Sequence, residues 1–392
     1  MSITVNQLLQ KAEEKVGKGD WDGAIHLLDT VLRQAPENGD ALHFLGLIKY
    51  QLGNLKASLP LLKKAVEISK GHPAVLANYG SVLNAVMAWS ESELVNRQAL
   101  EKDPNKIQAL IGLATSLMEQ GQLEIALEVC EKAAQIDNKN PSVQIALGNI
   151  NRRLRQLDDA VHSYQCAVEC DPKNALAYAN LGAILREKGM LEAAESACRR
   201  AIELRPDYAE AYNNLGVVLA ADDDNMGAFK AFEKALSLNP AFFDAGVNKG
   251  GALYKLDRMD EAEEAYENTI KLNPGDPISR NGLGVVLLAR GQTLEAATKF
   301  RQAIDLDPTY GEAIYNLASS RHGQLSAEDV TAIEGLIAEG NLNHSSLVFL
   351  HFALAEVADH EKDWENAFAH AMKGNQVRNA LLESQGCTFD AD

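Results

Sequence analysis

The chain has 392 residues, of which 46% are hydrophobic and only 6% aromatic. Asp and Glu number 55 against 37 Lys and Arg, so the net charge is −18, and a surface this acidic argues against nucleic acid as a partner. No stretch approaches the roughly 18 uninterrupted apolar residues of a membrane span, and the N-terminal residues lack the basic and apolar regions of a signal peptide. We therefore expect a cytoplasmic protein that binds other proteins or peptides, basic ones in particular.

From Val5 to Tyr310 the sequence repeats with a period of 34 residues, in nine repeats without insertion or deletion. Two positions of the repeat always carry Gly, Ala or Ser. At position 8 these residues are Ala12, Gly46, Gly80, Ala114, Gly148, Gly182, Gly216, Gly250 and Gly284. At position 20 they are Ala24, Ser58, Ser92, Ala126, Ala160, Ala194, Ala228, Ala262 and Ala296. This regularity predicts nine copies of one small structural element.

The pattern within a repeat predicts two antiparallel helices joined by a short turn. The small residues at positions 8 and 20 are expected where the helices cross, because a larger side chain there would push the backbones apart. Larger apolar residues, such as Leu28, Phe232 and Phe300, fill position 24. Proline is frequent at position 32, where it ends one helix and opens the next. Pairs such as Gly19-Asp20 are typical of the turn between the two helices.

Two segments, Ala177–Gly182 and Ala211–Gly216, resemble the signature of the tetratricopeptide repeat. The resemblance covers almost the whole chain, and it implies stacked hairpins whose first helices line a concave groove. The expected fold class is therefore an all-α, right-handed α-solenoid of about eleven such hairpins. We expect nine regular repeats within residues 1–310, starting at residue 5, two degenerate repeats and a terminal helix in 311–383, and a tail or truncated linker in 384–392.

A second resemblance lies near the C-terminal end, in Phe349–Leu354, Trp364–His370 and Gly374-Asn375. These segments are similar to the last repeat before the catalytic domain in bacterial proteins that fuse tetratricopeptide repeats to a sulfotransferase. The likeness implies that a catalytic domain would follow, opening with a strand and a glycine-containing loop for the phosphosulfate donor. The tail Ser384–Asp392 is interpreted as a linker to such a domain.

The three tryptophans share one position of the repeat. Trp21 and Trp89 fall at position 17, directly after the turn between the helices, and Trp364 does so too when the last degenerate repeat is taken to begin near Val348. This agreement predicts that they pack in the core and do not form a ligand cage.

No catalytic or metal-binding motif is visible in the repeats. The histidines are scattered, and the spacing of His351, His360 and His370 fits neither a helical metal pair nor a zinc finger. The 5 cysteines are an odd number and show no paired spacing of a zinc site or a disulfide framework. Ungapped repeats also leave no insertion that could build a catalytic loop. We therefore predict no enzyme active site in these residues and no cofactor or metal.

Position 6 of the repeat carries a row of asparagines, which are the best candidates for contact with a partner. They are Asn78, Asn180, Asn214, Asn248 and Asn316. Position 6 is expected to point toward the concave side, where an amide can both donate and accept and could follow an extended peptide. The arrangement resembles the asparagine ladder in the repeats of O-linked N-acetylglucosamine transferases, which grips substrate peptides. The alternative is that Asn only caps or solvates the helix here. Four repeats interrupt the row with Phe44, Gly112, Ala146 and Gly282.

The leading functional hypothesis is a protein-interaction scaffold that holds an extended peptide or a partner helix in the concave groove. The alternative is the substrate-recognition arm of a transferase of the sulfotransferase type, whose catalytic domain is absent from these residues. A third hypothesis is self-association through an uncapped end of the solenoid.

Overall fold

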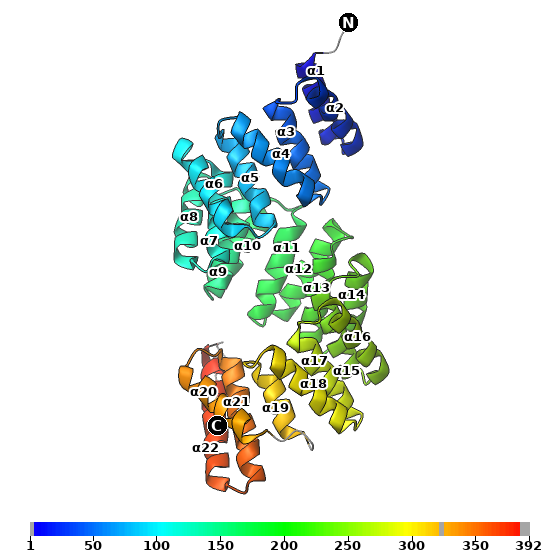
Figure 1. Cartoon of the computed structure of the whole chain (residues 1–392), viewed down its shortest axis with the longest axis vertical. Helices are drawn as coiled ribbons and strands as arrows, with labels where there is room; N and C mark the ends of the chain where they lie inside the picture. The colour runs from blue at the N-terminus through cyan, green and yellow to red at the C-terminus, as the bar shows by residue number, and fades with distance from the viewer. Residues whose placement is uncertain (1–3, 321–324, 385–392) are drawn as a thin grey trace. The chain divides into compact units, whose positions relative to one another are not determined.

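The computed structural model describes residues 4–320 and 325–384 (Figure 1). These residues form twenty-two α-helices and no strand, which confirms the predicted all-α solenoid class. The chain divides into two compact blocks, an N-terminal block Met1–Ile184 and a C-terminal block Leu185–Asp392. The tail predicted at 384–392 lies, apart from Ser384, outside the described residues.

The N-terminal block contains five complete helical hairpins, α1 to α10, and most of α11. The bounds of these helices are α1 Val5–Gly17, α2 Trp21–Gln34, α3 Gly39–Gln51, α4 Leu55–Ile68, α5 Pro73–Ala85, α6 Trp89–Lys102, α7 Ile107–Glu119, α8 Leu123–Ile136, α9 Pro141–Arg153, α10 Leu157–Cys170 and α11 Ala175–Glu187. Its core clusters are built from the small and branched residues of neighbouring hairpins, for example Leu113, Cys130 and Ile150 from α7, α8 and α9.

The C-terminal block contains the remaining helices. Their bounds are α12 Leu191–Leu204, α13 Ala209–Ala221, α14 Asn225–Leu238, α15 Phe243–Lys255, α16 Met259–Leu272, α17 Pro277–Ala289, α18 Thr293–Leu306, α19 Gly311–Ser319, α20 Ala327–Glu339, α21 His344–His360 and α22 Trp364–Ser384. From α13 to α18 these helices again pack as successive hairpins.

The helices recur with the period of the sequence. Successive first helices, from α1 at Val5 to α19 at Gly311, begin 34 residues apart, and so do the second helices from α2 to α18. Polar side chains at the helix starts satisfy free backbone N–H groups; Asn38, for instance, accepts from the Ala41 backbone at 2.8 Å. Strong helix formers, above all Ala and Leu, fill the interiors.

The turn between the two helices of each repeat places one residue in the left-handed conformation. These residues have φ values between 58° and 81°. They are Gly19, Gly53, Met87, Gly121, Arg155, Gly189, Asp223, Asp257 and Gly291. A side chain in this conformation costs roughly 1–2 kcal/mol. The turn geometry is therefore kept in all nine repeats, even in the four that lack glycine at this point.

The small residue at position 8 is required by the side chain at position 24 of the same repeat. A Cβ atom added to Gly216 would lie 2.4 Å from Cε1 of Phe232, which is closer than carbon atoms can approach. The same opposition recurs at Gly46 and Leu62, Gly80 and Asn96, Gly148 and Tyr164, Gly250 and Tyr266, and Gly284 and Phe300. Each of these position-24 side chains is buried. Glycine in the first helix thus makes room for a large group from the second.

The last helices depart from the regular hairpin. Helix α19 has only 9 residues and packs against α18 and α21, and α20 also packs against α21. Ile314, Ile333 and Leu350, one from each of α19, α20 and α21, share a core cluster. The final pair, α21 and α22, is the longest, with 17 and 21 residues.

The core packing predicted for Trp364 is wrong. Its side chain is 63% exposed at the start of α22, whereas Trp21 and Trp89 are half-buried. Trp21 packs against the core of the first hairpins. In the described part of the chain no further hairpin follows α22, so the same position of the repeat has nothing to pack against there.

We predict that Gly216→Ala lowers the free energy of unfolding by about 1–3 kcal/mol, because the added methyl group overpacks against Phe232. The matched control is Gly335→Ala in α20, where an added Cβ has no neighbour within 4 Å. That change is expected to stabilise α20 by about 0.5–1 kcal/mol through helix propensity. Thermal and urea unfolding followed by circular dichroism measure both variants, and equal effects would contradict the packing argument.

Candidate partner-binding groove

Two of the predicted asparagines in the C-terminal block join consecutive first helices. Asn248 Nδ2 donates to Asn213 Oδ1 at 3.0 Å, and Asn316 Nδ2 donates to Asn281 Oδ1 at 2.9 Å. In both pairs the acceptor occupies position 5 of the preceding repeat. These side chains therefore hold neighbouring repeats together, a role that the sequence pattern at position 6 alone does not reveal.

Asn78 plays the same part in the N-terminal block, within a longer network. Its Nδ2 lies 2.8 Å from Nε2 of His43, which occupies position 5 of the preceding repeat. Its Oδ1 accepts a hydrogen bond from Nε2 of Gln108 at 2.6 Å. The same Gln108 nitrogen lies 3.4 Å from Oγ of Ser81. This network links α3, α5 and α7.

Asn180 and Asn214 have different neighbours. In the sequence, position 5 of the preceding repeat is Ile145 for Asn180 and Ala179 for Asn214, where the other three asparagines have His43, Asn213 or Asn281. Asn180 lies in the N-terminal block and Asn214 in the C-terminal block, and both are half-buried. The five asparagines thus share a position in the repeat but have different surroundings.

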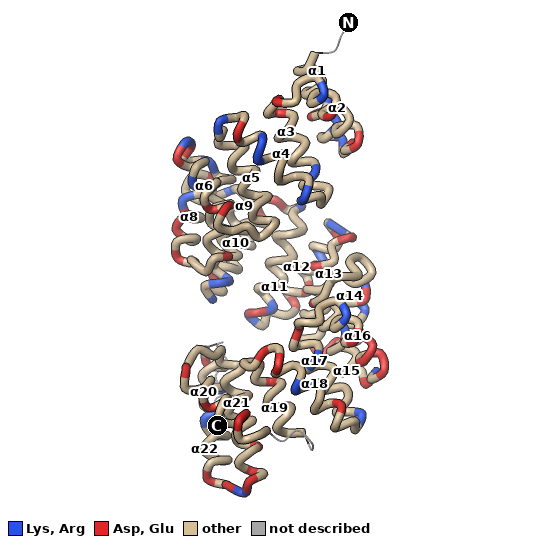
Figure 2. The backbone as a smooth tube through the Cα atoms, in the orientation of Figure 1, with Lys and Arg blue, Asp and Glu red and all other residues tan. Residues whose placement is uncertain are grey.

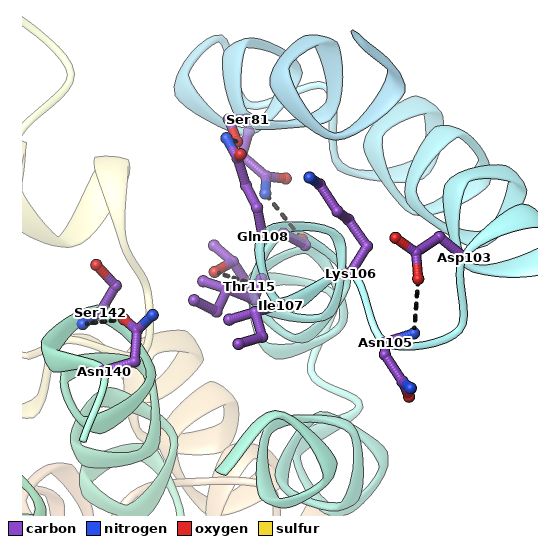
Figure 3. Close-up of a pocket in the computed structure, with 12 residues that line it drawn as sticks. Ser81, Asp103, Asn105, Lys106, Ile107, Gln108, Thr115, Asn140 and Ser142 are labelled. Carbon is purple, nitrogen blue, oxygen red and sulfur yellow. Dashed lines mark hydrogen bonds between the residues drawn. The ribbon is translucent and has the colours of Figure 1, made fainter. Parts of the chain in front are cut away.

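A hollow of about 790 Å³ opens among the first helices α5 and α7 and the start of α9, all within the N-terminal block. Figure 3 shows Ser81 on one side of it, Gln108 and Thr115 on α7 in the middle, and Asn140 with Ser142 at the start of α9. It is therefore a groove lined by first helices, of the kind expected from the sequence.

The lining of the groove is polar and carries little charge. Seven of its residues are amides or hydroxyls, namely Ser81, Asn84, Asn105, Gln108, Thr115, Asn140 and Ser142. Lys106 and Asp103 bring one charge of each sign, and Ile107 and Ile111 are the large apolar members. Such a surface can both donate and accept hydrogen bonds, as an extended peptide backbone requires.

Several of these polar groups are fixed by bonds to the backbone. Asn84 Nδ2 donates to the carbonyl oxygen of Gly112 at 2.9 Å, and Oγ1 of Thr115 donates to that of Ile111 at 2.9 Å. Asn140 Oδ1 accepts from the backbone of Ser142 at 3.0 Å and so caps α9. The groove wall is therefore ordered by the protein itself.

Gly112 lines the floor of the groove at position 6, where the preceding first helix has Asn78. A Cβ atom at Gly112 would lie 2.8 Å from the amide of Asn96, which is fully buried at position 24 of the preceding repeat. The Asn96 amide donates to the carbonyl oxygen of Ser92 at 2.9 Å. The sequence pattern shows Gly112 only as one of the residues that interrupt the row of asparagines at position 6. In the sequence this position is marked by a glycine at position 6 that follows an asparagine at position 24 of the preceding repeat.

His351 and His370, which are far apart in the sequence pattern, come together between α21 and α22. Their Nδ1 atoms lie 3.2 Å apart. Burial, with the charge of nearby groups, lowers the pKa of both imidazoles. Two nitrogens do not make a metal site by themselves, and the described residues contain no cluster of three or more His, Cys, Asp or Glu that could hold a metal ion.

Charge does not single out one surface. Figure 2 shows acidic and basic positions along both blocks.

Burial raises the pKa of the Cys130 and Cys198 thiols to about 12, so these two cysteines are protonated packing residues.

Within residues 4–320 and 325–384, no helix has the length and apolar character needed to cross a membrane.

Family models of the tetratricopeptide repeat match residues 9–73, 96–150, 148–189, 175–208, 197–230 and 247–311, which together make up more than half of the chain. This chain is a tetratricopeptide-repeat protein. The predicted family is thereby confirmed, whereas the likeness of residues 349–375 to sulfotransferase fusions stays a prediction.

Solved tetratricopeptide structures share the fold at low sequence identity. Yeast Tom70 is 15% identical, with 98% of this chain and 94% of that chain covered and a TM-score of 0.54. A tetratricopeptide repeat protein from Parabacteroides merdae is 17% identical, with 64% and 98% covered and a TM-score of 0.53. The human IFIT1 dimer with m7Gppp-AAAA is 15% identical, with 96% and 91% covered and a TM-score of 0.57. At these identities the likeness shows the fold alone. No curated protein matches the sequence.

We predict that Asn248→Ala lowers the free energy of unfolding of this tetratricopeptide array by about 1 kcal/mol, since Asn213 loses its donor. Asn180→Ala is the matched control, because Ile145 precedes it at the bridging position. Its effect is expected to stay within about 0.5 kcal/mol. Urea unfolding compares the two variants, and an equal loss in both would show that the bridge contributes nothing.

Proposed function

We propose that this protein is a scaffold that holds an extended peptide in the groove of α5, α7 and α9. Tetratricopeptide arrays bind other proteins, and membership of this family supports the general role. The observation that carries the finer proposal is the polar, backbone-ordered lining of the hollow at Gly112. Its amides and hydroxyls match the alternating N–H and C=O groups of an extended chain without demanding particular side chains.

Electrostatics and the remaining asparagines add to this proposal. The net charge of −18 favours the approach of basic peptides. Asn180 and Asn214 stay candidates for partner contact, since each is a half-buried amide at the position of the repeat that the sequence pattern singles out. Asn78 is proposed to act differently, by fixing the spacing of α5 and α7, which line the groove, while Asn248 and Asn316 fix the spacing of first helices in the C-terminal block.

The groove can be tested with peptides selected from a random library on the full chain. Ser81→Trp places a large side chain into the hollow at a residue that lines it. We expect this variant to bind the selected peptides about tenfold more weakly or worse, because the groove is filled. Fluorescence polarisation measures the affinities.

Glu128→Trp is the control for this experiment. Glu128 is exposed on α8, outside the hollow, and the change introduces the same side chain. Circular dichroism should show equal helicity for both variants. Selected peptides that bind Ser81→Trp as tightly as the wild type would refute the proposed groove.

The alternative function, the recognition arm of a sulfotransferase-type transferase, rests on the resemblance of residues 349–375. A reading frame that continues beyond Asp392 into a domain with a glycine-containing loop would favour it. Peptide binding in the groove belongs to both functions, so the genomic sequence and not the binding experiment separates them.

Self-association is a second candidate role, which one surface favours. Trp364, Phe368 and Met372 are 63%, 68% and 43% exposed, and their spacing of four residues puts them on one face of α22. Large apolar side chains grouped in this way are typical of docking surfaces. We propose that this face pairs with its counterpart in a second copy. An antiparallel pairing centred on Phe368 brings Trp364 against Met372 of the second copy, a favourable aromatic–sulfur contact.

We predict that Phe368→Glu shifts the protein toward the monomer, because it places a charge at the centre of the apolar face. Ala380→Glu, at an exposed position later on α22 that lies about a third of a turn away from Phe368, introduces the same charge and should leave association unchanged. Sedimentation equilibrium over a range of concentrations measures this. A wild-type protein that stays monomeric throughout would refute the pairing.

A further inference from the structure

Gln108, Asn78 and His43 form a directed chain of hydrogen bonds across three repeats. In the amide orientation of the structure, Asn78 Nδ2 lies 2.8 Å from Nε2 of His43 and donates to it, which corresponds to the neutral tautomer of His43 that carries its proton on Nδ1. Asn78 Oδ1 in turn accepts from Nε2 of Gln108 at 2.6 Å. Because the Gln108 nitrogen is engaged with Asn78, its oxygen Oε1 is the end of the carboxamide that is left for a ligand.

The three residues lie at different depths. Gln108 is exposed and lines the groove, whereas Asn78 and His43 are half-buried and do not line it. Two half-buried residues that do not line the groove, Asn78 and His43, thus determine whether Gln108 donates or accepts hydrogen bonds in it. As long as His43 is neutral and carries its proton on Nδ1, a ligand meets an acceptor at Gln108.

Protonation of His43 reverses every bond of the chain. Nε2–H becomes a donor, so the Asn78 amide has to turn and present Oδ1 to it. Asn78 Nδ2 then faces Gln108, which has to present Oε1 and direct its own nitrogen toward the groove. One proton on α3 therefore replaces an acceptor by a donor on α7.

We propose that Gln108 contacts the bound peptide, and that His43, acting through Asn78, sets whether Gln108 accepts or donates. The groove then accepts a backbone N–H of an extended peptide when His43 is neutral, and it loses this contact when His43 is protonated. The inference rests on the proposed peptide-binding function of the groove. Gln108 is the ligand-contacting residue, and Asn78 and His43 are positioning residues.

The surroundings of His43 place the reversal in mildly acid solution. Burial lowers the pKa of His43, Asp40 on the same helix raises it, and His72 before α5 lowers it. Glu13 of α1 lines a small hollow together with Asp40 and Phe44, and it is a further charged group on the α1 side of α3. A lowered pKa favours the neutral ring in the folded protein. The acceptor state of Gln108 therefore holds at neutral pH and is lost only below the usual histidine range.

Side-chain amide NMR tests the relay without any ligand. In protein labelled with ¹⁵N at Asn and Gln, the NH₂ signals of Asn78 and Gln108 are assigned with Asn78→Ala and Gln108→Ala. We expect both signals to shift through one common midpoint on the acid side of the usual histidine range as the pH is lowered from neutral. In His43→Gln, which keeps an acceptor but does not titrate, they should stay in place. Signals that do not move in the wild type, or that move equally in His43→Gln, overturn the relay.

Binding is measured with a peptide selected on the full chain at about pH 7.5. Wild-type affinity is expected to fall as the pH drops through the titration of His43, by up to about tenfold once His43 is protonated, beyond any change in His43→Gln. His43→Lys, a permanent donor, should show the weak affinity already at neutral pH. His26→Gln, an exposed histidine on α2, is the control and should follow the wild type. Equal affinity of the wild type and His43→Lys at neutral pH overturns the proposal.

The two proposals fail in different ways. If Ser81→Trp leaves peptide binding intact, the groove is not the binding site, and peptide contact by Gln108 falls with it. If Ser81→Trp abolishes binding but His43→Lys does not weaken it, the groove stands and the control by His43 is refuted. The amide NMR decides the relay in either case.

Discussion

The close approach of glycine at position 8 to a large side chain at position 24 is the contact on which the rest of this structure depends. It brings the two helices of a repeat so near that Gly216 has no room for a Cβ atom beside Phe232. Because nearly the same contact recurs in successive repeats, each hairpin has nearly the same geometry and can stack on the next. The bridges between repeats, such as Asn248 to Asn213, need this constancy, since a hydrogen bond tolerates little variation in distance.

The groove arises where this packing rule takes an unusual form. In the third repeat a polar residue, Asn96, fills position 24, and its buried amide leaves no space for a side chain at Gly112 in the next repeat. Gly112 therefore lines the groove without a side chain, next to residues that carry amide and hydroxyl groups. A change in the core thus shapes the surface that a ligand would meet.

The fold could be predicted from the sequence almost completely, but the site could not. Small residues at fixed intervals set the register because they report on helix crossings within one repeat, which are local. The asparagine row was read from position 6 alone, whereas the contacts of Asn78 depend on His43 in one neighbouring repeat and Gln108 in the other. The predicted burial of Trp364 was wrong for a related reason. Its position in the repeat is buried only where another hairpin packs over it. A repeat pattern describes the residues that all repeats share, whereas the contacts of the candidate site depend on residues that differ between adjacent repeats.

The left-handed turns imply an uneven stiffness along the array. Met87, Arg155, Asp223 and Asp257 hold a backbone conformation that glycine adopts without strain in the other repeats. Since each repeat in such an array is stabilised mainly by its neighbours, this strain stays local and makes those turns the places where opening fluctuations begin. Aspartate adopts this conformation more readily than methionine or arginine does, so the turns at Met87 and Arg155 should be the softest of the four. Amide exchange and proteolytic nicking would start there long before the whole array unfolds.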